Sequence, residues 1–226
     1  MLRTVIFDFD GVITDSEILH FRSLNKVLAR FGFRMTKKDY YQNYLGLSDL
    51  DFFKELERKG RLQLNSRQTR QALEEKKQRY EKLAVTEGKI IEGVRSFLEM
   101  LRQNNILMAV CSGALLAEIN LILEGAKLTP FFEVIVSAEQ IKKGKPAPDG
   151  LLLTLQKLNK KNENPITAGQ CIVIEDSRWG LEAAKAAGMH PVAVTNSYGA
   201  EQLTPAEKVV DHLSELSMND LQQLCR

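Results

Sequence analysis

The 226-residue sequence contains few of the residues that hold small secreted folds or zinc sites together. It has three cysteines, Cys111, Cys171 and Cys225, and three histidines. The cysteines match neither a disulfide framework nor a zinc-binding spacing. Two of them, Cys111 and Cys171, lie in or beside apolar runs, where small buried thiols are ordinary. The sequence therefore argues against a disulfide-stapled scaffold and against a cysteine-ligated zinc centre.

Long apolar runs and a strong charge of one sign are also lacking. No stretch approaches the length of a membrane span, and we identify no signal peptide before the first strand pattern. The formal net charge is only +2, which argues against nucleic acid as the main partner. We therefore expect a cytoplasmic protein that binds neither membranes nor nucleic acid. Nothing in the sequence sets the oligomeric state, and a monomer is the favoured expectation.

What the sequence does contain is enough apolar residues for a substantial core, since 44% are hydrophobic. Short apolar runs that do not alternate with polar residues predict strands buried on both faces. Amphipathic stretches between these runs predict helices. Strand patterns cover 4–9, 106–112, 132–137, 171–176 and 191–196, and helical patterns cover 93–104, 114–125, 149–159 and 178–187. This alternation predicts an α/β fold with a doubly wound, Rossmann-like parallel sheet.

The segment 15–84 breaks the alternation and shows no strand pattern. It contains three helical patterns, at 16–32, 48–60 and 66–83. We therefore expect a core domain made of 1–14 and 85–226, with an inserted all-helical domain at 15–84. The insert is basic, with 16 lysines and arginines against 10 acidic residues, whereas the rest of the chain is acidic. This asymmetry suits an anionic substrate held beside a bound cation.

The residues that can carry chemistry follow the predicted core strands. They are Asp8 and Asp10, Ser112 and Gly113, Lys145, and Glu175 and Asp176. Because the loops after parallel strands meet at one edge of the sheet, these side chains should gather there. Clustered carboxylates without histidine or cysteine favour Mg²⁺. Lysine, a hydroxyl and a backbone N–H near a helix start favour a phosphate group.

Two aspartates one residue apart suit a covalent reaction in two steps. Asp8 can act as the nucleophile that takes a phosphoryl group as an acyl phosphate. Asp10 can protonate the leaving oxygen and then deprotonate the incoming one. Ser112, Gly113 and Lys145 would hold the phosphate. The pattern thus indicates phosphoryl transfer through an acyl phosphate on Asp8.

Four ordered motifs resemble those of the haloacid dehalogenase-like hydrolase superfamily. They are "DFDGVITD" at 8–15, Ser112-Gly113, Lys145-Pro146 and Glu175-Asp176-Ser177. The insert after the first motif resembles the helical cap of its subfamily I, in the branch that includes β-phosphoglucomutase and phosphoglycolate phosphatase. The resemblance implies Mg²⁺ held by the Asp8 carboxylate, the Asp10 main-chain carbonyl and Asp176, with Glu175 as ligand or outer partner.

The resemblance leaves a phosphatase and a β-phosphoglucomutase-like sugar phosphate mutase as alternatives. His20 stands at a spacing that resembles the mutase branch, which favours a mutase. That branch places basic residues on both sides of a Gly-x-Ser in the insert, whereas this chain has Leu45 and Asp49 there. A carboxylate near a second phosphate would weaken its binding. We therefore expect hydrolysis, with a sugar, polyol or carboxylate phosphate as substrate.

We expect residues of the insert to determine which substrate the protein accepts. We assign this role to Leu45, Leu47, Asp49 and Phe52. Lys76 and Tyr80 stand four residues apart on the third helical pattern. Because that helix is rich in charge, the pattern favours a solvated face for both residues.

Overall fold

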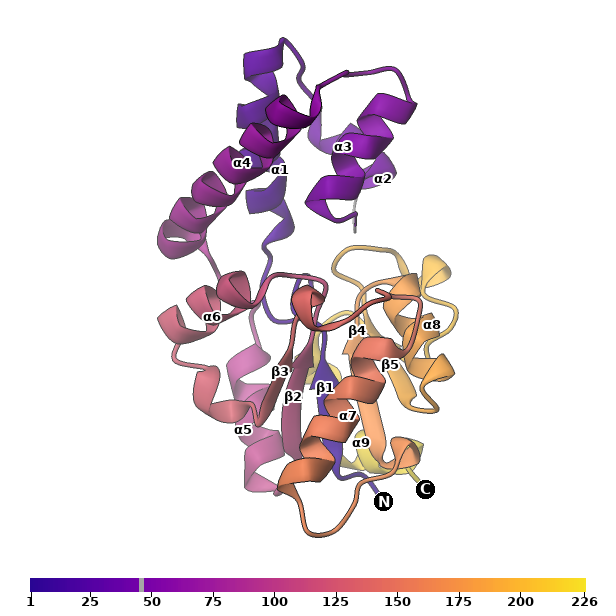
Figure 1. The fold of residues 1–226 in the computed structure, drawn as a ribbon. Coiled ribbons are helices and arrows are strands. Elements are labelled where there is room, and N and C mark those ends of the chain that lie inside the picture. The colour runs from indigo at the N-terminus through magenta and orange to yellow at the C-terminus, as the bar shows by residue number, and fades with distance from the viewer. Residues whose placement is uncertain (45–46) are drawn as a thin grey trace. The chain divides into compact units, whose positions relative to one another are not determined.

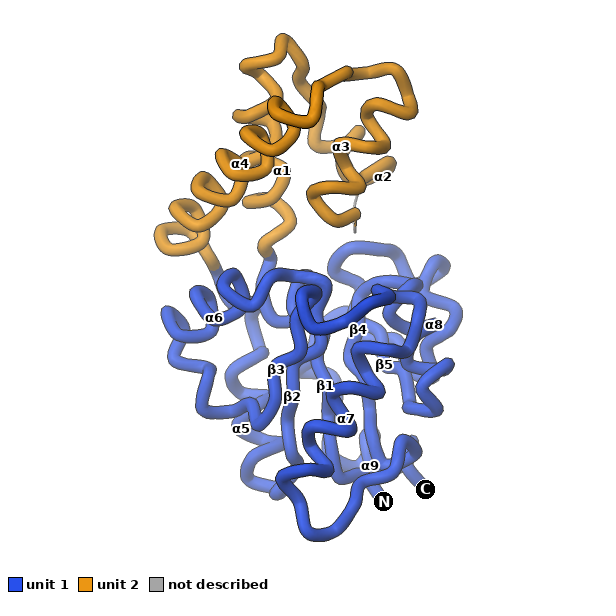
Figure 2. The backbone as a smooth tube through the Cα atoms, viewed as in Figure 1, with its two compact units in different colours: residues 1–15, 89–226 blue, residues 16–88 orange. Residues whose placement is uncertain are grey.

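The computed structural model describes residues 1–44 and 47–226, and the chain divides into two compact units (Figures 1 and 2). The α/β unit comprises Met1–Asp15 and Lys89–Arg226, and the helical unit comprises Ser16–Gly88. The last helix of the helical unit continues to Glu87, past residue 84, where the sequence analysis ends the insert.

The α/β unit is built on one parallel sheet, as the sequence predicts. Its strands have the order β3-β2-β1-β4-β5-β6, and every neighbouring pair is parallel. The strands are β1 (Thr4–Phe7), β2 (Leu107–Cys111), β3 (Val134–Val136), β4 (Cys171–Glu175), β5 (His190–Val194) and β6 (Lys208–Val210). The first five correspond to predicted runs. The edge strand β6 was not predicted, because three residues with a lysine give little strand signal.

The central strand β1 pairs with β2 on one side and with β4 on the other. All residues of β1 and β4 are buried, which is why these strands are apolar without alternation. The Asp8 N–H continues the pairing by donating to the Ile174 carbonyl at 2.9 Å. Residues that follow β1 and β4 are therefore held side by side.

Helices cover both faces of this sheet (Figure 1). They are α5 (Val94–Gln103), α6 (Leu116–Gly125), α7 (Asp149–Lys161), α8 (Arg178–Ala186) and α9 (Met218–Leu224). On one face, α7 and α8 pack in the same apolar cluster as Ile6 of β1. On the other face, Phe97 of α5 packs edge-on against Phe7, with ring centroids 6.0 Å apart. Successive β1 side chains thus anchor opposite layers.

The described residues of the helical unit form four α-helices where three patterns were predicted. They are α1 (Glu17–Leu28), α2 (Lys37–Asn43), α3 (Asp49–Arg58) and α4 (Ser66–Glu87). The seven-residue α2 was missed because its lysines and tyrosines show little apolar periodicity. Ser48 caps α3, since its hydroxyl accepts from the Asp51 N–H. The helices enclose a separate core that includes Leu24, Tyr44 and Phe52.

No helix within the described residues is long and apolar enough to span a membrane.

Candidate active site

Three buried carboxylates meet where β1 and β4 end. Asp8 directly follows β1, Glu175 is the last residue of β4, and Asp176 comes next. Each offers an oxygen that lies within 4.8 Å of the other two. Their exposed fractions are 8%, 0% and 4%. The sequence therefore correctly predicts that these side chains lie together.

Lys145 joins this group from the loop that follows β3. Its ammonium donates to Asp8 Oδ1 and to Glu175 Oε1, and it reaches the Cys111 carbonyl at 3.2 Å. One lysine thus bridges the ends of three strands, β1, β2 and β4. We refer to Asp8, Lys145, Glu175 and Asp176 as the carboxylate–lysine cluster.

Glu175 is held from its other side by the start of α8. Its Oε2 accepts from the Ser177 hydroxyl at 2.8 Å and from the Asp176 and Ser177 N–H groups at 3.2 Å. A Cβ at Gly180 would lie 1.8 Å from Glu175 Oε1, so this close approach requires glycine. Both Glu175 oxygens therefore already have protein partners, which suits a residue that positions Lys145.

Asp176 packs against the turn that follows β1. Gly11 has φ +79°, and a Cβ there would lie 1.7 Å from Asp176 Oδ2. Only glycine satisfies both the positive φ and the close contact. The Gly11 N–H donates to the Thr14 carbonyl at 2.8 Å, which closes the turn that carries Asp10. Asp10 is half-buried in this turn, two residues beyond Asp8.

Ser112 and Gly113 directly follow β2 at the same edge of the sheet. Ser112 is 2% exposed, and its hydroxyl accepts from the Ala114 N–H at 3.0 Å. Gly113 is exposed. All seven residues proposed from the sequence thus occupy strand ends or the loops that follow them.

Burial and crowding set the charge balance of the cluster. Burial raises the pKa of Asp8 to about 7; Lys145 opposes this rise, whereas the Glu175 and Asp10 carboxylates add to it. Burial by itself would lower the pKa of Lys145, but Asp8 and Glu175 outweigh it and raise that pKa well above its usual value. Lys145 therefore stays protonated, and the carboxylates around it outnumber its single positive charge.

The helical unit holds a buried lysine, which corrects one prediction. Lys76 is 1% exposed and Tyr80 is fully buried, so neither residue lies on a solvated face. The Lys76 ammonium lies 2.8 Å from Asp49 Oδ2 and 2.8 Å from His20 Nδ1. The His20 and Tyr80 rings pack with centroids 4.2 Å apart. We refer to His20, Asp49, Lys76 and Tyr80 as the buried lysine cluster.

His20 accepts a hydrogen bond in this cluster and is held neutral. Burial lowers its pKa well below the usual value, and the Lys76 ammonium lowers it further. A protonated His20 would place two positive charges 2.8 Å apart, which is unfavourable.

The residues expected to shape the substrate have different environments. Leu45 lies outside the described residues. Leu47 is 42% exposed, and Asp49 is engaged with Lys76. Phe52 is 1% exposed, and its ring packs against Tyr44 at 5.1 Å inside the core of the helical unit. The expectation that Phe52 contacts substrate is therefore wrong.

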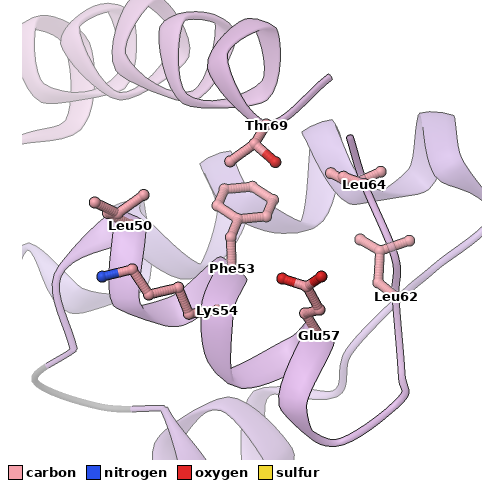
Figure 3. Close-up of a pocket in the computed structure, with 7 residues that line it drawn as sticks. All are labelled: Leu50, Phe53, Lys54, Glu57, Leu62, Leu64 and Thr69. Carbon is pink, nitrogen blue, oxygen red and sulfur yellow. The ribbon is translucent and has the colours of Figure 1, made fainter. Parts of the chain in front are cut away.

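A pocket in the helical unit contains none of the predicted site residues. Its lining comes from α3, the following loop and the start of α4, namely Leu50, Phe53, Lys54, Glu57, Leu62, Leu64 and Thr69 (Figure 3). Lys54 is paired with Asp51 at 2.9 Å. The polar lining of this pocket consists of Lys54, Glu57 and Thr69, and we assign the pocket no chemistry.

Sequence analysis missed one segment at the edge of the sheet. After β5, Asn196 Nδ2 donates to the Gly11 carbonyl at 2.7 Å, and the Ser197 hydroxyl donates to Asp176 Oδ2. The only signal in the sequence is their position at the end of a strand pattern, because "TNSYG" forms no part of the four motifs.

The α/β unit has carboxylates and a lysine at the carboxyl edge of a parallel sheet, and the helical unit is inserted after β1. This combination is typical of one class of hydrolytic enzymes. The model of the haloacid dehalogenase-like hydrolases matches residues 5–194. The chain belongs to this family.

Two phosphatases and a β-phosphoglucomutase are among the proteins to which this chain is similar. The chain is 30% identical to a phosphorylated carbohydrates phosphatase of Thermotoga maritima, over 95% of this chain and 100% of the relative. It is 28% identical to hexitol phosphatase B of Escherichia coli (strain K12), over 97% and 96% of the two chains. Its structure is similar to that of a β-phosphoglucomutase from Clostridium difficile, with a TM-score of 0.84, 26% identity and coverage of 100% and 97%.

Proposed function

We propose that the protein is a Mg²⁺-dependent phosphatase that hydrolyses a small phosphorylated sugar or polyol through an aspartyl-phosphate intermediate. The observation that carries this proposal is the carboxylate–lysine cluster, in which the buried Asp8 carboxylate forms an ion pair with the Lys145 ammonium. The two phosphatase relatives support the same chemistry and suggest the substrate class.

The donor set fits a hard divalent cation. Asp8, Glu175 and Asp176 offer only oxygen, and Lys145 is the one basic group among them in the described structure. Burial raises the pKa of Asp8, and the neighbouring Glu175 and Asp10 carboxylates add to the rise, so a bound cation would offset part of this cost. Asp8 and Asp176 would hold Mg²⁺ together with the Asp10 main-chain carbonyl, while Glu175 would position Lys145. When bound, the ion would neutralise charge on the transferring phosphoryl group.

In the first step, an Asp8 carboxylate oxygen attacks phosphorus. The bond between phosphorus and the leaving oxygen breaks, and Asp10 supplies the proton that the leaving alkoxide needs. Lys145 and the Ser112–Gly113 segment would bind the phosphoryl oxygens whose charge must be stabilised. The products of this step are the free alcohol and the acyl phosphate on Asp8.

In the second step, Asp10 accepts a proton from water, and the water oxygen attacks phosphorus. The bond from phosphorus to the Asp8 oxygen breaks, which releases inorganic phosphate and restores the carboxylate. Asp10 returns to its protonated state and is ready for the next turnover.

A β-phosphoglucomutase-like activity is the second candidate. The similarity to the structure of the Clostridium difficile β-phosphoglucomutase and the contact between His20 and Lys76 favour it. Charge in the helical unit argues against it. Asp49 already offsets the charge of Lys76, and this pairing leaves less attraction for the second phosphate that a mutase must hold. We therefore favour water over a sugar hydroxyl as the acceptor.

One experiment separates the two candidates. The enzyme is given β-glucose 1-phosphate, a trace of the 1,6-bisphosphate and Mg²⁺, and glucose 6-phosphate and inorganic phosphate are followed together. A parallel panel of sugar and hexitol monophosphates is scored for phosphate release. We expect phosphate release with at least one small phosphomonoester and little isomerisation. Sustained glucose 6-phosphate formation with negligible phosphate release would overturn the phosphatase proposal.

A further inference from the structure

The segment that follows β5 contacts two other loops of the site. Asn196 Nδ2 donates to the carbonyl of Gly11 at 2.7 Å, and Ser197 Oγ donates to Asp176 Oδ2. Gly11 belongs to the turn after β1, and Asp176 follows β4. Two adjacent side chains thus tie together the ends of three strands.

The packing around Gly11 shows how closely these groups fit. A Cβ on Gly11 would lie 1.7 Å from Asp176 Oδ2 and 2.9 Å from Ser197 Oγ. The absence of a side chain there lets the aspartate, the serine and the turn share one contact point. Ser197 is half-buried, so its hydroxyl is partly shielded from competing water.

We propose that Ser197 is a positioning residue that sets the orientation of the Asp176 carboxylate for a divalent cation, and that Asn196 holds the turn carrying Asp10 in register with it. The inference rests on the proposed metal site. A neutral hydroxyl that donates to one oxygen of a carboxylate fixes the plane of the group without cancelling its charge. Such outer partners typically contribute about 10- to 100-fold in metal affinity.

The test measures metal binding directly, without turnover. Mn²⁺ is titrated into the full-length protein, free Mn²⁺ is followed by electron paramagnetic resonance, and Mg²⁺ is used as the competitor. We expect Ser197→Ala to weaken Mn²⁺ and Mg²⁺ binding about tenfold. The Mg²⁺ concentration for half-maximal phosphatase rate should rise by the same factor, whereas kcat and KM for the phosphomonoester at saturating Mg²⁺ should change less than about twofold.

Two further variants make the result specific. The Thr195 hydroxyl lies in the same segment but donates to Asp211 Oδ1 at 2.6 Å. The Thr195→Val variant removes this hydroxyl and should leave metal binding unchanged. Ser197→Thr keeps the hydroxyl and should keep the affinity, which guards against a general loss of packing in the alanine variant.

Equal metal affinity in Ser197→Ala and the wild type would overturn the inference, as would an equal loss in Thr195→Val. A tenfold loss in Ser197→Thr would also overturn it, because the hydroxyl is still present. If the wild type binds no Mn²⁺ or Mg²⁺ at all, the proposed metal site itself fails, and that outcome is distinct from a failure of Ser197 alone.

Discussion

Each unit of the protein pairs a lysine with carboxylates, but Lys145 is half-buried and Lys76 is buried, and the two lysines stand in different charge environments. Lys145 of the α/β unit faces Asp8 and Glu175, with Asp176 beside them. Lys76 of the helical unit faces Asp49 and donates a hydrogen bond to the neutral His20. The first cluster has an excess of negative charge, whereas in the second the lysine has a compensating carboxylate.

This difference indicates what each cluster is for. A cluster of like charges costs stability and persists where a ligand or a reaction uses it. A buried lysine with a partner carboxylate stabilises the one arrangement of helices that brings the two together, because a buried charge without a partner raises the free energy of the folded state. We therefore expect substitutions in the carboxylate–lysine cluster to reduce activity, and substitutions in the buried lysine cluster to reduce stability.

The largest expected effect comes from Asp8→Asn, which keeps the shape of the side chain and removes the nucleophile. Phosphate release should fall at least about 10³-fold, or ~4 kcal/mol in the activation barrier. The free energy of unfolding should stay equal or rise, because one of the crowded carboxylates is gone. Asp15→Asn, at an exposed position in the same segment, is the matched control. A variant that keeps more than about a tenth of the wild-type rate would rule out Asp8 as nucleophile.

The next effect concerns the metal. Asp176→Ala should lower phosphatase activity by more than about 100-fold, and excess chelator should do the same to the wild-type enzyme. Added Mg²⁺ should restore the chelated wild type but not the variant. Glu182→Ala, which removes an exposed carboxylate paired with Arg178 on α8, serves as control. Full activity in excess chelator would contradict the Mg²⁺ requirement.

The opposite behaviour is expected for the partner of Lys76. Asp49→Ala removes a carboxylate from a lysine that is 1% exposed, and we expect a loss of about 2 kcal/mol in the free energy of unfolding by urea. The loss is smaller than for a fully buried pair because Asp49 is 31% exposed. Asp51→Ala on the same helix breaks an exposed pair with Lys54 and should cost less than about 1 kcal/mol. Equal losses in the two variants would show that the buried lysine cluster contributes nothing special to stability.

The two clusters also differ in how far the sequence could predict them. The carboxylate–lysine cluster was found because its members follow strand patterns, and parallel strands bring their carboxyl ends to one edge. Lys76 was assigned to a solvated face because helical periodicity describes one helix at a time. Its partners His20 and Asp49 come from α1 and α3. No local pattern predicts which helix packs over which face of α4.

Two other misses have related causes. Ser197 acts from a loop, where no periodicity marks a side chain that points back at the site. Strand β6 has three residues and lies at the edge of the sheet, so its pairing with β5, rather than its composition, makes it a strand. Both depend on contacts between segments that are distant in the sequence.

The smallest expected effect tests the neutral state of His20. Its pKa is lowered in the folded protein, while the unfolded chain takes up a proton near pH 6.5. The unfolded state therefore binds more protons below that pH, and stability falls as the pH drops from about 6.5 toward the folded pKa. At pH 5.5 this linkage costs up to about 1.4 kcal/mol relative to pH 7.5, the value reached when the folded state takes up no proton. Urea unfolding of the wild type and of His20→Gln at both pH values measures it, because the variant lacks this contribution. His212→Gln, at an exposed position, controls for removal of a histidine elsewhere. If His20→Gln loses as much stability as the wild type between the two pH values, His20 is not held neutral by burial and by Lys76. The buried lysine cluster would then tolerate a second positive charge, and its charge compensation would no longer argue against a site for a second phosphate.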